Sequence, residues 1–345
     1  MDSSPLRQAL NALAHHQSLP EDLTALVFGV VMNGEATPTQ IAALLMGLRT
    51  KGETPEEVAG AARALRAAMV PVGASGPYLV DTCGTGGGTV PTFNISTVAA
   101  FVAAGAGATV PKHGNRSFTS RCGSADVLEA LGVRIVLDAP AATRVLREAR
   151  VAFLFAPTFH PAMKHVAPVR RELGMPSVMN LVGPLANPAG VLRQVIGVAD
   201  HDRAPVVAEA LVRLGAEHAL VVHGRVGMDE ISPVGVTDVW EVRDGAVRAW
   251  EIDPERYRLG SADVAALKGG EPAENADRLE RILGNGDGDA SGLAAVLLNA
   301  GAAIYVAGIA ASYAEGIGRA REVVASGAAR GALDRLRKAT ASISG

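Results

Sequence analysis

Four of the five residues 84–88 are glycine, and this segment restricts the fold of the chain more than any other. A short apolar run, residues 78–81, precedes it, and a helical pattern begins at or near Ser96-Thr97. Glycines let a backbone turn tightly and bring its N–H groups against a ligand. The start of a helix adds unpaired N–H donors and a positive dipole end. The segment therefore predicts a strand, a loop and a helix that together bind a phosphate or diphosphate.

The same residues have a simpler interpretation, a tight turn followed by Ser96 or Thr97 as an ordinary helix cap, because a turn and a phosphate cradle need the same residue types. Two familiar nucleotide loops are excluded. A dinucleotide fingerprint would need Gly at Thr89 or Pro91, and a Walker-type loop would end in Gly-Lys-Ser/Thr.

Short apolar segments alternate with Ala-rich helical stretches along most of the chain. We expect strands at 78–81, 134–137, 152–155, 193–198 and 218–223, and helices at 97–106, 125–131, 141–150 and 204–214. This alternation is typical of a parallel sheet with helices on both faces, whose ligands bind at the carboxyl ends of the strands. The predicted fold class is α/β with a mostly parallel central sheet flanked by helices.

Residues 1–72 lack such strands and predict a small helical domain. Apolar residues recur there at helical spacing, and Thr37-Pro38 and Thr54-Pro55 are typical helix starts. Pro and Gly cluster at 71–77, where we expect the domain to end.

Composition excludes several classes of protein. The chain has 345 residues with a net charge of −3 and no long basic run, which argues against a nucleic-acid-binding protein. The N-terminus lacks the basic-then-apolar order of a signal peptide. The apolar stretch 296–311 is interrupted by Asn299 and two glycines, so we expect a buried helix rather than a membrane span. Only Cys83 and Cys122 are present, which excludes a disulfide framework. We expect a cytoplasmic enzyme.

Residues 112–124 carry a Lys, a His, two Arg and several hydroxyl side chains without any Asp or Glu. Ammonium, guanidinium and hydroxyl groups suit an anionic substrate; the alternative is a solvated polar loop. Asp229 and Glu230 follow the expected strand 218–223 through a glycine-containing loop. Adjacent carboxylates usually lie on a surface turn, but at a strand's carboxyl end they suit Mg²⁺, which takes one or two carboxylates plus substrate oxygens and water.

Several motifs, in order along the chain, closely resemble the anthranilate phosphoribosyltransferase family: TFNIST at 92–97, KHGNRS at 112–117, GSADVLEALG at 123–132, HPAMK at 160–164, PVRRELG at 168–174, NLVGPLANPA at 180–189, HGRVGMDEIS at 223–232 and LNAGAAIYVAG at 298–308. The resemblance implies a nucleoside phosphorylase/phosphoribosyltransferase-like fold, in which the helical domain is completed by about 165–190. The α/β domain would then comprise 77–164 and 191–345. A homodimer through the helical domain is also implied.

The resemblance implies a reaction in which anthranilate receives the phosphoribosyl group of 5-phosphoribosyl 1-diphosphate (PRPP), with a magnesium cofactor of two ions and neither nucleic acid nor membrane as partner. No residue is expected to act as a general acid or base. Residues expected at the metal ions are Ser96, Asp229 and Glu230; those expected at anthranilate are Gly84, His113, Asn115, His160 and Arg170. Those expected at PRPP are Gly84, Gly87, Gly88, Thr92, Asn94, Ile95, Ser96, Thr97, Lys112, His113, Gly114, Asn115, Arg116, Ser117, Phe118, Thr119, Ser120 and Ser124.

Two alternative functions fit the fold, and the chain departs from the family's sequence pattern at two positions. Pyrimidine nucleoside phosphorylases share the fold but resemble KHSTGG at the phosphate loop, which this chain lacks. A catalytically silent, nucleic-acid-binding relative would need a basic groove, which the net charge of −3 argues against. The family usually has Asp at the position of Gly88, so a carboxylate is lost there. Pro176 also departs from the family pattern and stiffens the chain.

Overall fold

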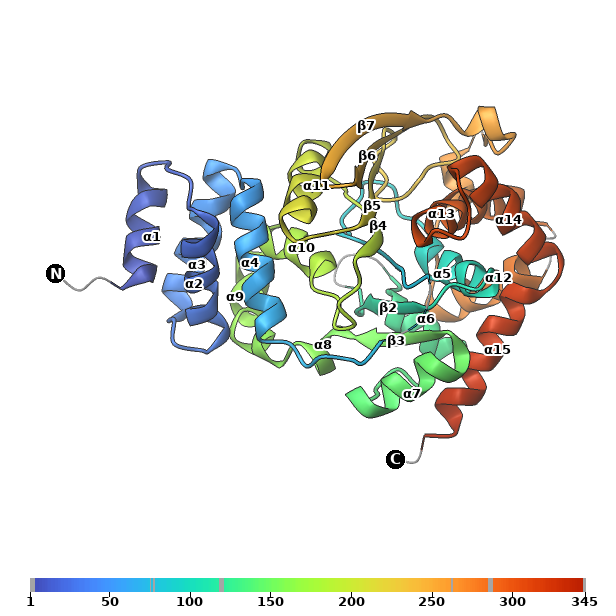
Figure 1. Cartoon of the computed structure of the whole chain (residues 1–345), viewed down its shortest axis with the longest axis horizontal. Helices are drawn as coiled ribbons and strands as arrows, with labels where there is room; N and C mark the ends of the chain where they lie inside the picture. The colour runs from blue at the N-terminus through green and yellow to red at the C-terminus, as the bar shows by residue number, and fades with distance from the viewer. Residues whose placement is uncertain are drawn as a thin grey trace.

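The helical part of the chain begins with four helices that lie at one end of the molecule (Figure 1). The computed structural model describes residues 4–74, 76, 78–117, 121–261, 263–284 and 288–343. The four helices are α1 (Pro5–Ala14), α2 (Glu21–Met32), α3 (Pro38–Lys51) and α4 (Pro55–Ala67). Both expected helix starts are confirmed: Thr37 and Thr54 each form a capping box, with Gln40 and Glu57 respectively.

A later stretch of the chain returns to these helices. It contains α8 (Ala156–Phe159), the 3₁₀ turn η1 (Pro161–His165), α9 (Ala167–Leu173), α10 (Val178–Val182) and η2 (Gly183–Leu185). Buried residues of this stretch, among them Val166, Val169 and Val182, belong to the same hydrophobic cluster as α1–α4. In Figure 1, α9 and α10 lie beside α3 and α4, although more than a hundred residues separate them in sequence.

Two sheets form the centre of the larger part. Five strands lie in the order β1 (Asp81–Gly84), β4 (Arg193–Gly197), β5 (His218–Gly224), β6 (Thr237–Arg243) and β7 (Ala246–Ile252). β1, β4 and β5 pair in parallel, whereas β6 and β7 add antiparallel ladders. β2 (Val110–Gly114) and β3 (Val151–Phe155) form a second parallel pair. A parallel bridge between Leu79, just before β1, and Thr109, just before β2, joins the two sheets.

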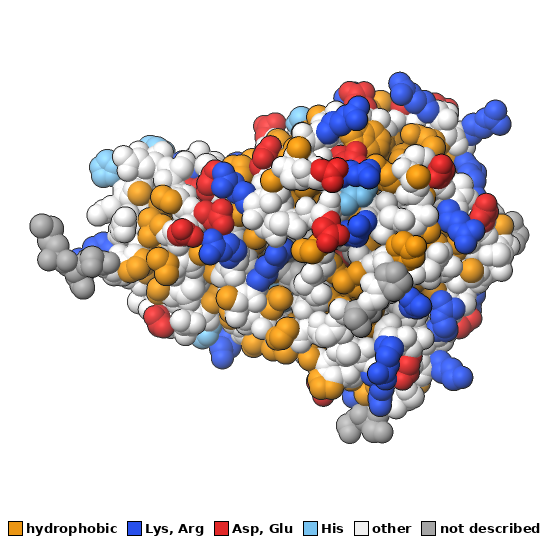
Figure 2. Space-filling model, in the orientation of Figure 1, with side chains coloured by type: hydrophobic (Ala, Val, Ile, Leu, Met, Phe, Trp, Pro, Cys, Tyr) orange, Lys and Arg blue, Asp and Glu red, His pale blue; other side chains and the backbone are white. Residues whose placement is uncertain are grey.

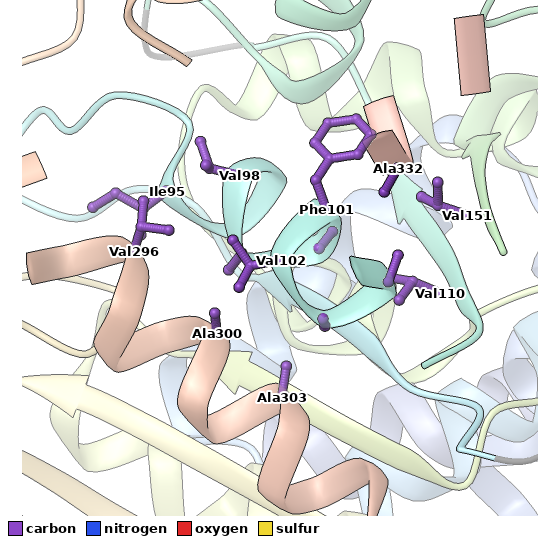
Figure 3. Packing of buried hydrophobic residues seen from close by; sticks show 14 of the residues in the cluster. Ile95, Val98, Phe101, Val102, Val110, Val151, Val296, Ala300, Ala303 and Ala332 are labelled. Atoms are coloured by element: carbon purple, nitrogen blue, oxygen red, sulfur yellow. The ribbon is translucent and has the colours of Figure 1, made fainter. Parts of the chain in front are cut away.

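Helices cover these sheets. They are α5 (Ile95–Gly105), α6 (Ser124–Ala130), α7 (Ala139–Ala149), α11 (Ala204–Arg213), α12 (Pro272–Gly284), α13 (Ala290–Ala307), α14 (Tyr313–Ala325) and α15 (Ala328–Ala341), with 3₁₀ turns η3 (His201–Arg203), η4 (Pro254–Tyr257) and η5 (Val264–Leu267). Figure 3 shows the centre of this core. Val98, Phe101 and Val102 of α5 lie between α13 on one side and the strand residues Val110 and Val151 on the other. Small residues such as Ala300 and Ala303 let α13 approach α5 closely, so the N-terminus of α5 is rigidly supported.

α13 confirms the expected buried helix. By length and composition it could cross a membrane, but 78% of its residues are buried inside the protein. An apolar helix with this degree of burial is the core helix of a folded domain.

Two of the predicted strands need correction, and one strand lies where a loop was expected. Residues 134–137 form no strand: their burial alternates as in a strand, but they pair with no strand among the described residues. The first strand begins at Asp81 and runs into Gly84, while residues 78–80 contribute only the bridge at Leu79. Lys112 and His113, expected in a loop, lie in strand β2.

Candidate active site

The glycine loop and the acidic pair meet at the carboxyl ends of the parallel strands. The backbone N–H of Gly86 donates to Asp229 Oδ2 at 2.9 Å, and the N–H of Ser96 donates to Glu230 Oε1 at 3.3 Å. Gly86 and Gly87 have φ values of +68° and +83°, which favour glycine. Gly84 is needed for another reason, since a Cβ there would lie 2.9 Å from Asp229 Oδ2. The loop therefore wraps closely around one carboxylate.

Both carboxylates are short of compensating charge. Burial raises the pKa of Asp229 above its usual value, against the effect of hydrogen bonds from the backbone N–H groups of Asp229 and Gly86. Burial, together with the neighbouring charge of Asp229, raises the pKa of Glu230 to about 8. Lys112 opposes that shift only in part. A cation placed between the carboxylates would restore their ionised forms.

Lys112 is buried beneath the loop rather than displayed on it. Its Nζ donates to the carbonyl of Thr82 at 2.6 Å and to Ser96 Oγ at 3.3 Å. Burial lowers the pKa of Lys112, and the charges of Asp81, Cys83 and Glu230 work against that shift. The Lys112 ammonium thus lies behind the first turn of α5, where its charge acts through Ser96.

The two predicted binding segments lie side by side. Asn94 Nδ2 donates to the carbonyl of Cys122 at 3.1 Å, which joins the start of α5 to the second segment. That segment folds back on itself, because Ser124 Oγ donates to the carbonyl of Asn115 and a Cβ at Gly114 would lie 2.4 Å from Ser124 Oγ. The two segments therefore converge at the start of α5.

Arg116 is not the free cation that the sequence suggested. Its Nη1 pairs with Asp126 at 2.7 Å and with Glu129 at 2.6 Å. The hydrogen bonds that Arg116 donates to Glu129 and Asp126 hold the pKa of Arg116 well above its usual range. The absence of acids within residues 112–124 was misleading, since helix α6 directly after the segment supplies them. Asp126 Oδ2 also accepts from the N–H groups of Ser117 and Gly123.

Two buried histidines join the second segment to the helical part. His113 Nε2 and His160 Nε2 lie 3.1 Å apart, so one ring donates to the other. Burial lowers the pKa of His113 to about 3, assisted by His160 and Lys112, and burial lowers the pKa of His160 to about 4. Both rings are therefore neutral at physiological pH.

Arg170 lies one short helix beyond His160, on α9. Its Nη2 donates to Asn180 Oδ1 at 3.3 Å, and no carboxylate neutralises it within the described residues. Burial lowers the pKa of Arg170. This half-buried guanidinium is the one expected to meet an anionic acceptor.

The remaining predicted residues differ in what they can offer a ligand. Ile95 and Thr97 are buried in the core, so Ile95 can contribute only its backbone. The Thr97 hydroxyl has no partner there. The backbone of Thr92 lies against Gly269. Phe118, Thr119 and Ser120 lie outside the described residues.

Comparison with known proteins determines the family. Residues 76–330 match the glycosyl transferase family, a/b domain, and residues 7–69 match the glycosyl transferase family, helical bundle domain. An anthranilate phosphoribosyltransferase from Myxococcus xanthus is 47% identical over 333 residues, covering 96% of this chain and 98% of the relative. The chain belongs to the anthranilate phosphoribosyltransferase family.

Solved structures of anthranilate phosphoribosyltransferases share the whole fold. The crystal structure of the enzyme from Thermus thermophilus is 44% identical with a TM-score of 0.91, covering 97% of this chain and 99% of that one. The Saccharomyces cerevisiae enzyme in complex with PRPP and Mg is 27% identical with a TM-score of 0.90, covering 99% of both chains. The predicted fold class, a helical domain with a mostly parallel α/β domain, is confirmed.

Two residues that shape the candidate site could not be identified from the sequence motifs. Gly197 ends β4, and a Cβ there would lie 1.7 Å from the carbonyl oxygen of Asp229, so only glycine lets the acidic loop pack against the sheet. Asn299 of α13 bonds the backbone of Ile231, directly after Glu230. A lone polar residue inside the most apolar stretch of the chain was the available signal for Asn299.

Gly88, the departure from the family pattern, also packs against the acidic loop. A Cβ at this position would lie 3.0 Å from Asp229 Oδ1 and 3.0 Å from the carbonyl of Gly227. A side chain at position 88 would therefore have to displace the Asp229 carboxylate slightly. Nothing in the structure explains Pro176.

Proposed function

We propose that the chain transfers the phosphoribosyl group of PRPP to the amine of anthranilate and releases diphosphate, a step of tryptophan biosynthesis. The observation that carries this proposal is the meeting of the glycine loop, the α5 N-terminus and two half-buried carboxylates with little compensating charge at one edge of the sheet. Membership of the family, one of whose members has been solved with PRPP and Mg, supports it.

The carboxylate pair suits magnesium as cofactor. Among the described residues, no three His, Cys, Asp or Glu side chains gather into a site that could bind a metal unaided. Asp229 and Glu230 with the Ser96 hydroxyl would therefore need diphosphate oxygens and water to complete a shell, which is the manner in which Mg²⁺ is usually bound. We propose two ions at this site, as in the family pattern. The bound metal would stabilise the charge that develops on the leaving diphosphate.

The chain's own groups would bind and orient the two substrates. In our proposal the N–H groups of residues 84–88 and of the first turn of α5 bind the diphosphate, and Lys112 adds positive charge from behind Ser96. Three further side chains, those of Asn94, Asn115 and Ser124, would line the part of the site that binds the ribose phosphate of PRPP. Arg116 would have to leave Asp126 and Glu129 to reach the diphosphate.

Anthranilate would enter from the side of the helical part. Its carboxylate suits the guanidinium of Arg170, and the neutral His113–His160 pair and Asn115 would line the pocket without attracting a second anion. The amine nitrogen bonds to the anomeric carbon as the bond to diphosphate breaks, and the amine proton passes to solvent. We propose a small domain of 1–72 with about 165–190, and a large one of 77–164 and 191–345, whose closure orients both substrates.

An apolar groove on the helical part supports the proposed homodimer. Its lining comes from α1, α3 and the turn after α1: Leu10, Leu13, Ala14, His16, Ala43, Met46, Gly47 and Thr50. Figure 2 shows hydrophobic side chains among the polar ones over this end of the molecule. We propose a second copy of the chain as its occupant. Light scattering on Met46→Glu should give a monomer if this is correct, and an unchanged dimer mass excludes this surface. The cytoplasmic location stays a prediction.

A fluorescence assay tests the reaction. Purified chain with anthranilate, PRPP and Mg²⁺ should consume the anthranilate fluorescence, and omission of any one should prevent the loss. Stable fluorescence with all components present would overturn the proposal. A parallel reaction with a pyrimidine nucleoside and inorganic phosphate tests the phosphorylase alternative, for which we expect no turnover.

A further inference from the structure

Asn299 makes a reciprocal pair of hydrogen bonds with the chain that follows the acidic residues. Its Oδ1 accepts from the N–H of Ile231 at 3.0 Å, and its Nδ2 donates to the carbonyl of Ile231 at 2.8 Å. The same Nδ2 donates to the carbonyl of Ala295 one turn earlier at 2.9 Å, which fixes the orientation of the amide. Asn299 is 3% exposed and Ile231 is fully buried. Without the amide, both backbone groups of Ile231 would lose these partners in the core.

The helix that carries Asn299 also supports the opposite side of the site. Figure 3 shows Val296 of α13 next to Ile95, and Ala300 facing Val102 of α5. Ile95 precedes Ser96, whose N–H donates to Glu230. α13 therefore contacts the first turn of α5 through its apolar face and the acidic loop through one amide. A small cavity of about 10 Å³ lies between the two contacts, with Ser96, Glu230 and Asn299 among its lining residues.

From this arrangement we infer that Asn299 is a positioning residue, which holds the Glu230 carboxylate in register with Ser96 so that the pair can bind a divalent cation together with diphosphate. The inference rests on the proposed function, since it assumes that Asp229 and Glu230 are the metal ligands. Asn299 touches neither substrate nor metal in this arrangement. Its effect should therefore fall on the metal requirement rather than on the affinity for anthranilate.

The test compares three variants. Asn299→Leu keeps the branching at Cγ and removes the amide, whereas Asn299→Gln keeps the amide on a longer side chain. Val306→Ala, two turns later on α13, is the matched control because it removes buried methyl groups from the same helix away from the acidic loop and the first turn of α5. Two quantities are measured beside the melting temperature: the Mg²⁺ concentration for half-maximal rate, and the binding of Mn²⁺ in the presence of PRPP, followed by the EPR signal of free Mn²⁺.

We expect Asn299→Leu to raise both the Mg²⁺ requirement and the apparent Mn²⁺ dissociation constant about tenfold or more, because the two hydrogen bonds that orient the loop are lost. Asn299→Gln should fall between this variant and wild type, and the KM for anthranilate should change little in both. Val306→Ala should lower the melting temperature with unaltered metal dependence.

Metal dependence that follows melting temperature alike in all three variants would overturn the inference, because Asn299 would then act only on stability. If Asn299→Leu does not fold, Asn299→Gln decides: a raised Mn²⁺ dissociation constant supports the inference, and a wild-type value overturns it. Failure of the wild-type chain to bind Mn²⁺ with PRPP would instead refute the proposed function, and this inference with it.

Discussion

Two glutamates, Glu57 in the helical part and Glu230 in the α/β part, have opposite surroundings. Glu57, fully buried in the helical part, accepts from the N–H groups of Leu19 and Thr54 at 2.8 and 2.9 Å and pairs with Lys51 Nζ at 2.9 Å. Glu230, half-buried in the α/β part, accepts one bond of 3.3 Å from Ser96 and lies beside a second carboxylate. The first glutamate is satisfied by its own fold. The second lacks such partners, which is what the proposed metal site requires.

The largest effect should come from removing the undercompensated pair. Asp229→Asn with Glu230→Gln keeps the shape of the loop but removes the charges that would hold magnesium. We expect the rate to fall by at least about 100-fold, in line with the loss of other groups that stabilise transition-state charge. Steady-state rates over a range of Mg²⁺ concentrations measure it. Asp238→Asn, a carboxylate on β6 paired with Arg225, is the control. Near-wild-type turnover in the double variant would contradict the metal role.

The satisfied glutamate should behave in the reverse way. Glu57→Ala leaves Lys51 buried without its partner, together with two backbone N–H groups. Breaking a buried pair by removing one partner typically costs about 3–5 kcal/mol of unfolding free energy. Denaturant unfolding measures that loss. The Mg²⁺ concentration for half-maximal rate, measured on the protein that remains folded, should not change. A large change in metal requirement without a loss of stability would contradict the contrast between the two sites.

The contrast also predicts how stability varies with pH. Glu230 has a raised pKa of about 8 against an ordinary value of 4.5, so between these values the native state binds more protons than the unfolded state. The contribution of Glu230 to the free energy of unfolding should therefore fall as pH rises from 5 to 8. Glu230→Gln lacks this penalty. In the absence of divalent cations, the melting temperature of the variant relative to wild type should rise with pH. A difference that stays constant with pH would show that Glu230 is not buried in its neutral form.

Much of this contrast could be predicted from the sequence, and the rest could not for identifiable reasons. The sequence predicted two parts of the site: Gly84 with the neighbouring glycines, and the pair Asp229 and Glu230. Each could be predicted because its residues lie together in one short stretch of the chain. The charge balance of Arg116 was missed, since its partners lie on the next helix. Burial of Lys112 depends on the pairing of β2 with β3, which no local pattern contains.

The sequence also contains a signal for a β-hairpin, between β6 and β7. Asp244-Gly245 joins β6 to β7 with both residues at positive φ, the geometry for which an Asp-Gly turn between strands is the strongest short-range indicator. The contact of Asn299 with Ile231 joins positions 68 residues apart. The sequence marked Asn299 as a polar residue in an apolar helix, but only the fold identifies its partner.

The smallest effect should come from the cation that the fold already satisfies. Arg116→Ala removes an exposed guanidinium held by Asp126 and Glu129. Exposed ion pairs of this kind contribute about 0–1 kcal/mol, so the melting temperature should change little. If Arg116 keeps its carboxylate partners during turnover, the KM for PRPP should rise by less than about threefold, which corresponds to a free-energy change below 1 kcal/mol. Arg330→Ala, which removes comparable ion pairs on α15, is the matched control. A tenfold rise in KM for PRPP in Arg116→Ala alone would mean that the guanidinium exchanges its two carboxylates for the diphosphate, and Arg116 would then belong with Glu230 among the groups that the ligand completes.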